Sequence, residues 1–238
     1  MCGCFIAFDS PIRHGFDFTP STSIFVRCDD EALEIQFHRC PLKQAWEGHG
    51  ITGDERLVLY DRGDGVGAMP AAQMAELAGH PRVAVLLGGL AAWPGEPEIG
   101  QVELHPVKTT FEPSLDAVPT REELVQRLDD PTLTILDVRT AEEFSGKRGY
   151  PCDPRQGRIP GARHVHVQDL FVASGEPLPG DHIRARIGDA DEIVAYCHSG
   201  SRSALATLAL RAAGFRARNY AGSWHEWSRH DELPMERG

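Results

Sequence analysis

The sequence predicts an α/β protein with mainly parallel sheets, organised as two consecutive domains. Apolar segments of strand length alternate with segments of helical periodicity, which is typical of parallel sheets covered by helices on both faces. In addition, residues 56–93 resemble residues 192–227, and Tyr60 aligns with Tyr196 at the end of an apolar run in each segment. Two copies of one supersecondary unit indicate two similar domains rather than a solenoid of many repeats.

The second copy shows each element most clearly. Residues 193–196 (IVAY) form the predicted strand, and a helix is expected to begin at about Ser201. Small and apolar residues recur at a spacing of three to four along this helix, which indicates one buried stripe. Gly214 follows the last apolar position, as a glycine after a helix C-terminus does, and a further short strand and helical turn follow.

Upstream of this copy, Thr120 and Glu123 have the spacing of a capping box, which predicts a helix over REELVQRL. An apolar strand, LTILDVR (133–139), comes next. The proline-rich segment between the copies is typical of a linker. We therefore assign residues 1–100 to a first domain, 101–114 to a linker and 115–238 to a second domain. The first copy is short, which predicts a truncated or degenerate domain, with 23–27 (SIFVR) as a candidate early strand.

Composition limits the classes of partner. The 238 residues carry a net charge of −11, with a pI near 5.4. Such acidity argues against nucleic acid or an anionic membrane as the main partner, although a local basic site can still bind a small anion. No apolar run approaches the roughly 18 residues of a spanning helix, and no export signal is recognisable. We expect a cytoplasmic protein.

The six cysteines include no CxxC pair and no set at zinc-finger spacing, so neither a zinc site nor a disulfide framework is predicted. The start Met-Cys-Gly is shared with amidotransferases that use Cys2 as nucleophile, but nothing downstream supports that alternative. Cys152 is either a loop thiol without a partner or a neighbour able to form a disulfide with Cys197. The remaining cysteines are Cys4, Cys28 and Cys40.

Cys197 is the candidate nucleophile because it follows a strand directly and precedes a helix N-terminus. Backbone N–H groups and the helix dipole there stabilise a thiolate. Gly200 allows the loop to fold inward, and Arg202 adds a permanent cation. A buried structural cysteine is the alternative, but it requires no polar loop. We expect the following loop residues to bind an anionic substrate: His198, Ser199, Gly200, Ser201 and Arg202.

Four motifs resemble those of the rhodanese sulfurtransferases: 137–146 (DVRTAEEFSG), 158–171 (RIPGARHVHVQDLF), 196–203 (YCHSGSRS) and 220–227 (YAGSWHEW). The last is similar to the ending of tandem-domain thiosulfate and 3-mercaptopyruvate sulfurtransferases. The resemblance implies two rhodanese-like domains, each with a five-stranded, mainly parallel sheet, and it implies that Cys197 is catalytic.

The chemistry implied by the resemblance is covalent sulfur transfer. Cys197 takes the outer sulfur of a donor such as thiosulfate, stores it as a persulfide and passes it to cyanide or a thiol. No metal or organic cofactor is required. The expected partners are a small anionic donor and a thiophilic acceptor, with a sulfur-accepting protein as a further candidate.

Three alternatives remain open. A phosphatase or arsenate reductase of this scaffold has a C-x5-R loop, whereas Cys197 and Arg202 form the shorter C-x4-R, which favours a single sulfur atom. The loop CHSGSR matches neither the usual mercaptopyruvate loop nor the usual thiosulfate loop, and Glu143 is shared with a bacterial branch of the thiosulfate enzymes. We favour thiosulfate over 3-mercaptopyruvate. A carrier module that holds sulfur without turnover is the third alternative.

The remaining site residues come from other segments. By the resemblance, Arg155 contacts substrate, although an ordinary structural role is the alternative. Asp137 and Arg139, at the end of a strand, are expected to brace the active loop rather than touch substrate. In the first copy Asp61 stands in place of Cys197, and a carboxylate cannot hold a sulfane sulfur. We therefore expect the first domain to be inactive.

Overall fold

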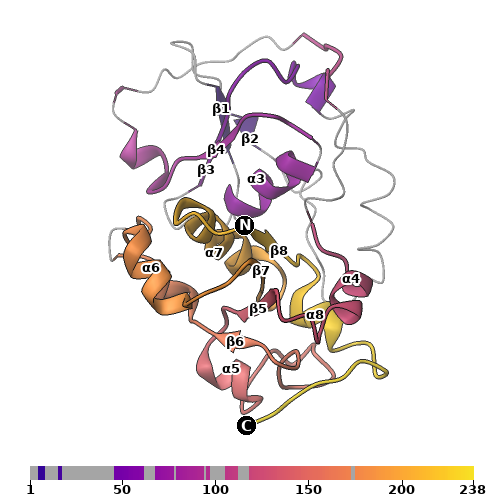
Figure 1. The fold of residues 1–238 in the computed structure, drawn as a ribbon. Coiled ribbons are helices and arrows are strands. Elements are labelled where there is room, and N and C mark those ends of the chain that lie inside the picture. The colour runs from indigo at the N-terminus through magenta and orange to yellow at the C-terminus, as the bar shows by residue number, and fades with distance from the viewer. Residues whose placement is uncertain are drawn as a thin grey trace. The chain divides into compact units, whose positions relative to one another are not determined.

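The computed structural model divides the chain into two compact units, Met1–Ala117 and Val118–Gly238 (Figure 1). It describes residues 5–8, 16–17, 46–61, 68–77, 79–93, 95–96, 105–111, 118–172 and 175–238. Several features named above lie outside these ranges: Cys2, Cys4, Cys28, Cys40, the candidate strand 23–27 and both ends of the linker 101–114.

The second unit is built on a fully parallel sheet in the order β6-β5-β7-β8 (Figure 1). The α/β class with a parallel sheet is therefore confirmed. The sheet has four strands rather than the five implied by family resemblance, since the other β-pairings described in this unit are single bridges. The strands are β5 (Leu133–Asp137), β6 (Arg163–His164), β7 (Glu192–Tyr196) and β8 (Ala217–Asn219).

Helices cover both faces of this sheet, and β7 is buried on each side. Ile193 and Ala195 pack with α6, α7 and η3, whereas Val194 and Tyr196 pack with α4 and α8. The alternation follows from the two-residue period of a strand. The helices are α4 (Arg121–Gln126), α5 (Ala141–Ser145), η3 (Val167–Leu170), α6 (Gly180–Ile187), α7 (Ser201–Ala212) and α8 (Ser223–Trp227).

The predicted capping box at α4 is only half formed. The Thr120 side chain accepts a hydrogen bond from the backbone N–H of Glu123, but the Glu123 carboxylate pairs with Arg127 and Arg218 instead of turning back to the cap. Charge-assisted bonds from these two guanidinium groups use both Glu123 oxygens. A complete box occurs at α5, where Thr140 and Glu143 bond reciprocally.

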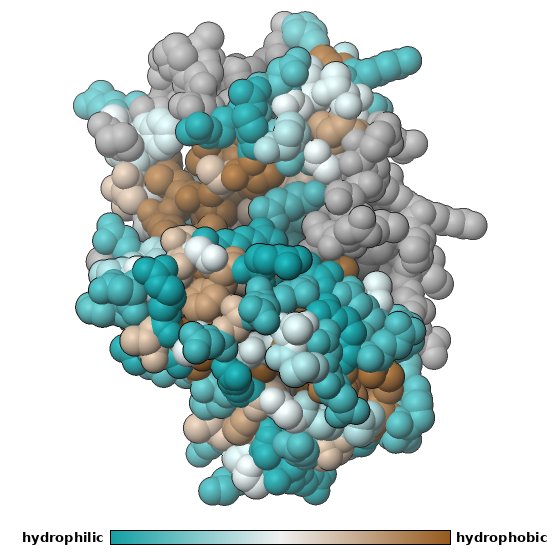
Figure 2. Space-filling model, in the orientation of Figure 1, coloured by the Kyte–Doolittle hydropathy of each residue, from teal (hydrophilic) through white to brown (hydrophobic). Residues whose placement is uncertain are grey.

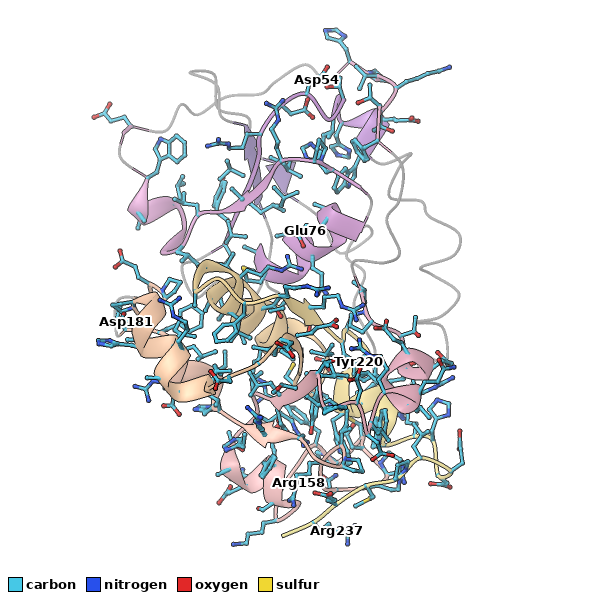
Figure 3. The ribbon with its side chains drawn as sticks, in the orientation of Figure 1. Asp54, Glu76, Arg158, Asp181, Tyr220 and Arg237 are labelled. Atoms are coloured by element: carbon cyan, nitrogen blue, oxygen red, sulfur yellow. The ribbon has the colours of Figure 1, made fainter. Side chains whose placement is uncertain are left out.

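The chain end closes the second unit beside the segment that follows α5. The backbone groups of Arg158 and Glu236 exchange hydrogen bonds of 3.0 Å, and the Arg237 guanidinium donates to the carbonyl of Gln156 at 2.7 Å (Figure 3). The visible face of this unit is mostly hydrophilic, with apolar residues in scattered patches (Figure 2). In the described part of the chain, no helix has the length and apolar character needed to cross a membrane.

The first unit contains a mixed sheet in the order β2-β1-β3-β4. Only β3 and β4 are parallel among its described pairings, because β1 runs antiparallel to β2 and to β3. The predicted mainly parallel sheet is therefore wrong for this unit. Between β1 and β2 the chain is too short for a parallel crossover, which needs about a dozen residues or more. The elements are β1 (Phe5–Phe8), β2 (Phe16–Asp17), β3 (Leu57–Tyr60), α3 (Ala68–Leu77), β4 (Val83–Val85) and η1 (Gly89–Ala92).

Part of the predicted linker 101–114 belongs to the first unit. The backbone N–H groups of Val107 and Thr110 donate to the carbonyls of Glu47 and Thr52, both at 2.9 Å. Phe111 is buried in the core of this unit, where its ring packs edge-on against Trp46. Residues 105–111 are therefore packed against the first unit and are not a free tether.

Candidate active site

Strand β7 and helix α7 place Cys197 at the carboxyl end of the parallel sheet. The cysteine follows Tyr196, the last residue of β7, and α7 begins four residues later, as predicted. Gly200 links the two with a left-handed backbone, at φ of 87°. A Cβ atom at this position would lie 2.7 Å from the carbonyl oxygen of Ala221. Gly200 is thus required both by its dihedral angle and by the close approach of another backbone segment.

The Cys197 sulfur faces one backbone donor and one hydroxyl group. The backbone N–H of Gly200 donates to Sγ at 3.2 Å, and the Ser223 hydroxyl oxygen lies 4.0 Å away. The Ser223 oxygen accepts from the Cys197 N–H at 3.1 Å and lies 2.8 Å from the Tyr220 carbonyl, so its single proton can be given to that carbonyl or to the sulfur but not to both. The Gly200 N–H, together with the N-terminus of α7, stabilises negative charge on the sulfur.

Ser223 is a site residue that the sequence analysis missed. Its φ of 55° makes it the one described non-glycine residue with a left-handed backbone. Such a conformation costs about 1–3 kcal/mol and persists where the surrounding structure requires it. The strain holds the hydroxyl against the Cys197 loop. The signal in the sequence was the motif YAGSWHEW (220–227), which carried the resemblance without singling out Ser223.

The candidate nucleophile, Cys197, is buried. Cys197 is 1% exposed and contributes to the core formed by β5, β7, α6 and α7. Its loop amide nevertheless points at the sulfur rather than away from it. A donor can therefore reach the sulfur only when neighbouring residues move, which favours small reactants.

Arg202 does not face the loop as a free cation. Its guanidinium makes two hydrogen bonds to the Glu143 carboxylate, at 2.9 and 2.8 Å. Burial opposes ionisation of Glu143, but the hydrogen bonds from Arg202 and Thr140 outweigh it and lower the pKa of the carboxyl group from 4.5 to about 2. Burial likewise opposes the charge of Arg202, but Glu143 and the nearby Cys197 raise the pKa of the guanidinium. The pair ties α5 to the first turn of α7.

The other loop residues differ in placement. The His198 side chain is buried. Its ring stacks on Tyr150, with centroids 3.7 Å apart, and its Nε2 lies 3.2 Å from Asp153 Oδ1. Ser199 and Ser201 are half-buried beside Cys197 in the chain. Asp153 is a second residue that the sequence analysis missed, since nothing in the local pattern distinguishes it from an ordinary loop aspartate.

Asp137 and Arg139 form a buried ion pair beneath the loop. Their exposed fractions are 0% and 1%, and Arg139 Nη2 lies 2.6 Å from Asp137 Oδ2. The same guanidinium donates to the Gly157 carbonyl and lies over the rings of Tyr196 and Trp224. These contacts are those of a brace between β5, β7 and α8.

Arg155 has a structural placement instead of the predicted substrate contact. Its guanidinium donates to the backbone carbonyls of Trp227, Ser228, His230 and Leu233. Four carbonyl acceptors take four of the five N–H donors of the guanidinium, so the side chain holds the segment after α8 in place.

In the first unit, Asp61 occupies the position that corresponds to Cys197, directly after β3. It is 7% exposed, and its Oδ2 accepts a hydrogen bond from the N–H of Ala68, the first residue of α3, at 3.1 Å. The carboxylate therefore acts at the helix N-terminus, where a negative charge is favourable.

The chain is similar to known sulfurtransferases over most of its length. A family model described as the rhodanese-like domain matches residues 120–230. A probable 3-mercaptopyruvate sulfurtransferase from Pseudomonas aeruginosa is 34% identical over 206 residues, which cover 82% of this chain and 71% of the relative. A thiosulfate sulfurtransferase from Corynebacterium glutamicum is 31% identical over 206 residues, covering 79% and 68%.

Solved structures give the same picture. The crystal structure of a probable thiosulfate sulfurtransferase is 33% identical, with a TM-score of 0.66 over 87% of this chain and 83% of that one. An anaerobic ergothioneine biosynthesis enzyme from Chlorobium limicola, solved with trimethyl histidine, is 27% identical with a TM-score of 0.73. The match covers 84% of this chain but 56% of the Chlorobium enzyme.

Proposed function

This chain belongs to the rhodanese family of sulfurtransferases, and we propose that it moves the sulfane sulfur of thiosulfate to a thiophilic acceptor through a persulfide on Cys197. The observation that supports this proposal is the donation of the Gly200 N–H to Cys197 Sγ at 3.2 Å, at the N-terminus of α7. A fixed donor at that point stabilises both a thiolate and the terminal sulfur of a persulfide.

The proposed reaction has two displacement steps. The Cys197 thiolate attacks the outer sulfur of thiosulfate, a bond forms between the two sulfur atoms, and the S–S bond of thiosulfate breaks. Sulfite leaves with the electron pair, and the enzyme carries a persulfide anion. Cyanide or a thiolate then attacks the terminal sulfur, and the Cys197 thiolate is regenerated. Neither step consumes an oxidant or a cofactor.

The first test is the Cys197→Ser variant with thiosulfate and cyanide as substrates. We expect thiocyanate formation to fall to background, and we expect mass spectrometry of the thiosulfate-treated wild type to show one added sulfur atom that the variant lacks. Thiocyanate formation by the variant at the wild-type rate would show that another residue carries the sulfur.

A second donor is favoured by one specific observation: the relative from Pseudomonas aeruginosa that is 34% identical has the name 3-mercaptopyruvate sulfurtransferase. Relatives named thiosulfate sulfurtransferase occur at 30–33% identity, so the names alone do not decide. Supplying each compound as the sole donor and comparing kcat/KM distinguishes them. We expect the larger value with thiosulfate, and a larger value with 3-mercaptopyruvate would reassign the donor.

A carrier that holds sulfur for a partner protein is the further alternative, although the burial of Cys197 favours small reactants over a protein acceptor. A carrier forms the persulfide once but turns over slowly with small acceptors. We propose that the protein is an enzyme rather than a carrier. Its sulfur donor is a small anion, and its acceptor is a thiol of the reducing cytoplasm. The first domain takes no part in the chemistry. Multiple turnovers with thiosulfate and cyanide support the enzyme, whereas a single turnover followed by arrest would favour the carrier.

A further inference from the structure

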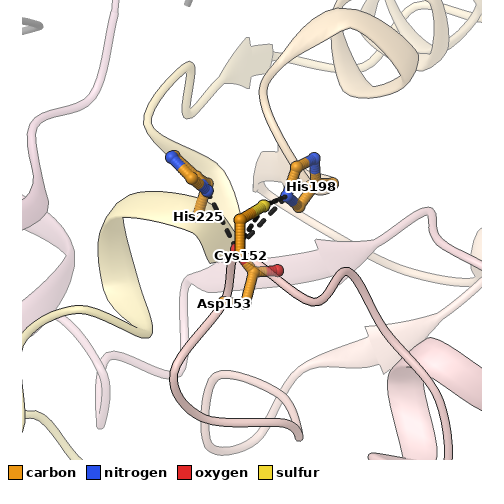
Figure 4. A group of neighbouring side chains, drawn as sticks. All are labelled: Cys152, Asp153, His198 and His225. Atoms are coloured by element: carbon orange, nitrogen blue, oxygen red, sulfur yellow. Dashed lines mark hydrogen bonds and ion pairs between the residues drawn. The ribbon is translucent and has the colours of Figure 1, made fainter. Parts of the chain in front are cut away.

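Four side chains with metal-binding atoms converge beside the Cys197 loop: Cys152, Asp153, His198 and His225 (Figure 4). Each offers one ligand atom, and these atoms all lie within 4.8 Å of one another. They come from three separate parts of the second unit: the loop after α5, the loop after β7, and helix α8. We propose that this cluster is a binding site for a zinc-class divalent ion.

The spacing of the ligand atoms agrees with a tetrahedral ion. Zinc bonds of about 2.0–2.3 Å place tetrahedral ligand atoms about 3.3–3.6 Å apart. In this cluster Asp153 Oδ1 lies 3.2 Å from His198 Nε2 and 2.9 Å from His225 Nδ1. Cys152 Sγ lies 3.9 Å from His198 Nε2 and 4.0 Å from Asp153 Oδ1. The four separations bracket the tetrahedral spacing.

The donor set also has the chemistry that zinc prefers. One thiolate, one carboxylate and two imidazoles combine soft and borderline ligands, which are unsuited to magnesium or calcium. Binding would release the Cys152 proton and leave each imidazole proton on the nitrogen that points away from the ion. Without an ion the same side chains form a hydrogen-bond network, in which the Cys152 thiol donates to Asp153 Oδ1 at 4.0 Å and lies 3.9 Å from His198 Nε2, and zinc binding would replace these contacts with bonds to the ion.

Burial and supporting contacts are those of a formed site. Asp153, His198 and His225 are 5%, 7% and 6% exposed, whereas Cys152 is half-buried and gives an ion a side from which to enter. Neighbouring groups orient the ligands. The Tyr150 ring stacks on the His198 ring, and the backbone N–H of His225 donates to the backbone carbonyl of His198 at 2.9 Å. Such orienting contacts are typical of metal sites.

The proposed ion would attach the Cys197 loop to helix α8. His198 follows Cys197 directly, and the carbonyl of Cys197 accepts from the Trp224 N–H of α8 at 3.0 Å. An ion shared by His198 and His225 would add a second tie between this loop and α8. Its role is therefore structural, and the sulfur-transfer steps do not pass through it.

The test is cobalt and zinc binding to the full-length protein after removal of metal with a chelator. We expect one ion per chain after dialysis, and we expect Co²⁺ to give the visible bands of a tetrahedral site with a thiolate-to-cobalt charge-transfer band. Cys152→Ser should abolish the charge-transfer band and weaken zinc binding by more than about tenfold, since even the loss of an outer-shell partner costs about 10–100-fold. Cys152 is half-buried and the change is nearly isosteric, so this variant should fold, which circular dichroism checks.

Two further variants make the result specific. His225→Gln should weaken zinc binding in the same way, whereas His230→Gln should not, because His230 pairs with Glu232 outside the cluster. Cys197→Ser should keep the cobalt spectrum while losing sulfur transfer, so a failure of the metal site and a failure of the proposed function are distinguishable. A charge-transfer band that persists in Cys152→Ser, disappears in Cys197→Ser or is absent from the wild type would overturn the proposal.

Discussion

Two segments of this chain have the same order of strand, helix and strand, but the residue that follows the first strand is Asp61 in one and Cys197 in the other. In the first unit β3 leads through Asp61 into α3, and in the second β7 leads through Cys197 into α7. Each strand pairs in parallel with the strand that follows the helix. The glycines after the two helices, Gly79 and Gly214, both have φ of 90°.

The residue after the strand determines what each segment can do. Asp61 carries its own fixed charge and accepts the first N–H of α3. Cys197 has no charge as a thiol, and the amide of Gly200 and the hydroxyl of Ser223 face its sulfur. The same position in the fold therefore serves as a helix cap with a carboxylate and as a nucleophile with a thiol. Every prediction below tests one part of this difference.

The largest effect is expected when the second segment is given the residue of the first. Cys197→Asp should abolish sulfur transfer, because a carboxylate forms no persulfide. The new carboxylate should still accept the Gly200 N–H, so the second unit should remain folded, which thermal unfolding checks. Cys197→Ser is the matched inactive control. Residual persulfide formation in the aspartate variant would show that Cys197 is not the acceptor of sulfur.

Gly200→Ala should have the next largest effect. A left-handed backbone costs an L-residue about 1–2 kcal/mol, and the new Cβ would also lie 2.7 Å from the Ala221 carbonyl oxygen. We expect a lower free energy of unfolding and a marked loss of kcat, because the amide that faces Cys197 belongs to the displaced residue.

Gly161→Ala separates the cost of a left-handed backbone from the cost of the steric clash. Gly161 has φ of 70°, and a Cβ there would meet nothing within 4 Å. This control should therefore show the backbone cost without the clash and without loss of kcat. Equal effects on kcat in both variants would contradict a specific role for the Gly200 amide.

The sequence predicted those parts of the site that depend on local order. Apolar periodicity located β7 and α7, and the position of Cys197 between them follows from chain order alone. Asp137 and Arg139 pair with each other in the structure, and their role as a brace for the Cys197 loop stays a prediction.

The contacts that could not be predicted join distant segments. Arg155 was expected to bind substrate, but its guanidinium reaches carbonyls more than 70 positions later, as its bond to Ser228 shows. Arg202 was expected to add a permanent cation to the loop, with a salt-bridged side chain as the alternative, and the sequence could not identify its partner, Glu143, which lies 59 residues away. Periodicity reports which face of an element is buried, but it does not report which long side chains meet across the sheet.

The Glu143–Arg202 pair gives a pH-dependent prediction. Because the pKa of Glu143 is lowered from 4.5 to about 2, the pair stabilises the folded state above about pH 4.5, and this contribution is lost as the pH falls from 4.5 to 2. A shift of this size corresponds to at most about 3 kcal/mol. Glu143→Gln should therefore be less stable than the wild type at pH 7, and the difference should shrink towards pH 2.

Urea unfolding of both proteins at a series of pH values measures this difference. Glu142→Gln is the matched control, since Glu142 lies on the same helix but is exposed and faces Arg148 at 3.7 Å. Exposed pairs contribute about 0–1 kcal/mol, so this variant should follow the wild type closely. A constant difference between Glu143→Gln and the wild type from pH 7 to 2 would assign the effect to packing instead of charge.

The smallest effect is expected in the first segment. Asp61→Ala removes the carboxylate that accepts the Ala68 N–H, and loss of a helix N-terminal acceptor costs about 0.5–2 kcal/mol. Hydrogen exchange should show faster exchange at the start of α3, with α7 unchanged and with sulfur transfer unchanged. Asp61→Asn keeps an oxygen acceptor without the charge, so its exchange rate at the start of α3 should lie between those of the wild type and Asp61→Ala. Sulfur transfer should be measured under conditions in which Asp61→Ala is fully folded. A loss of activity there would show that the first segment takes part in the chemistry. The two segments would then not divide the roles of helix cap and nucleophile.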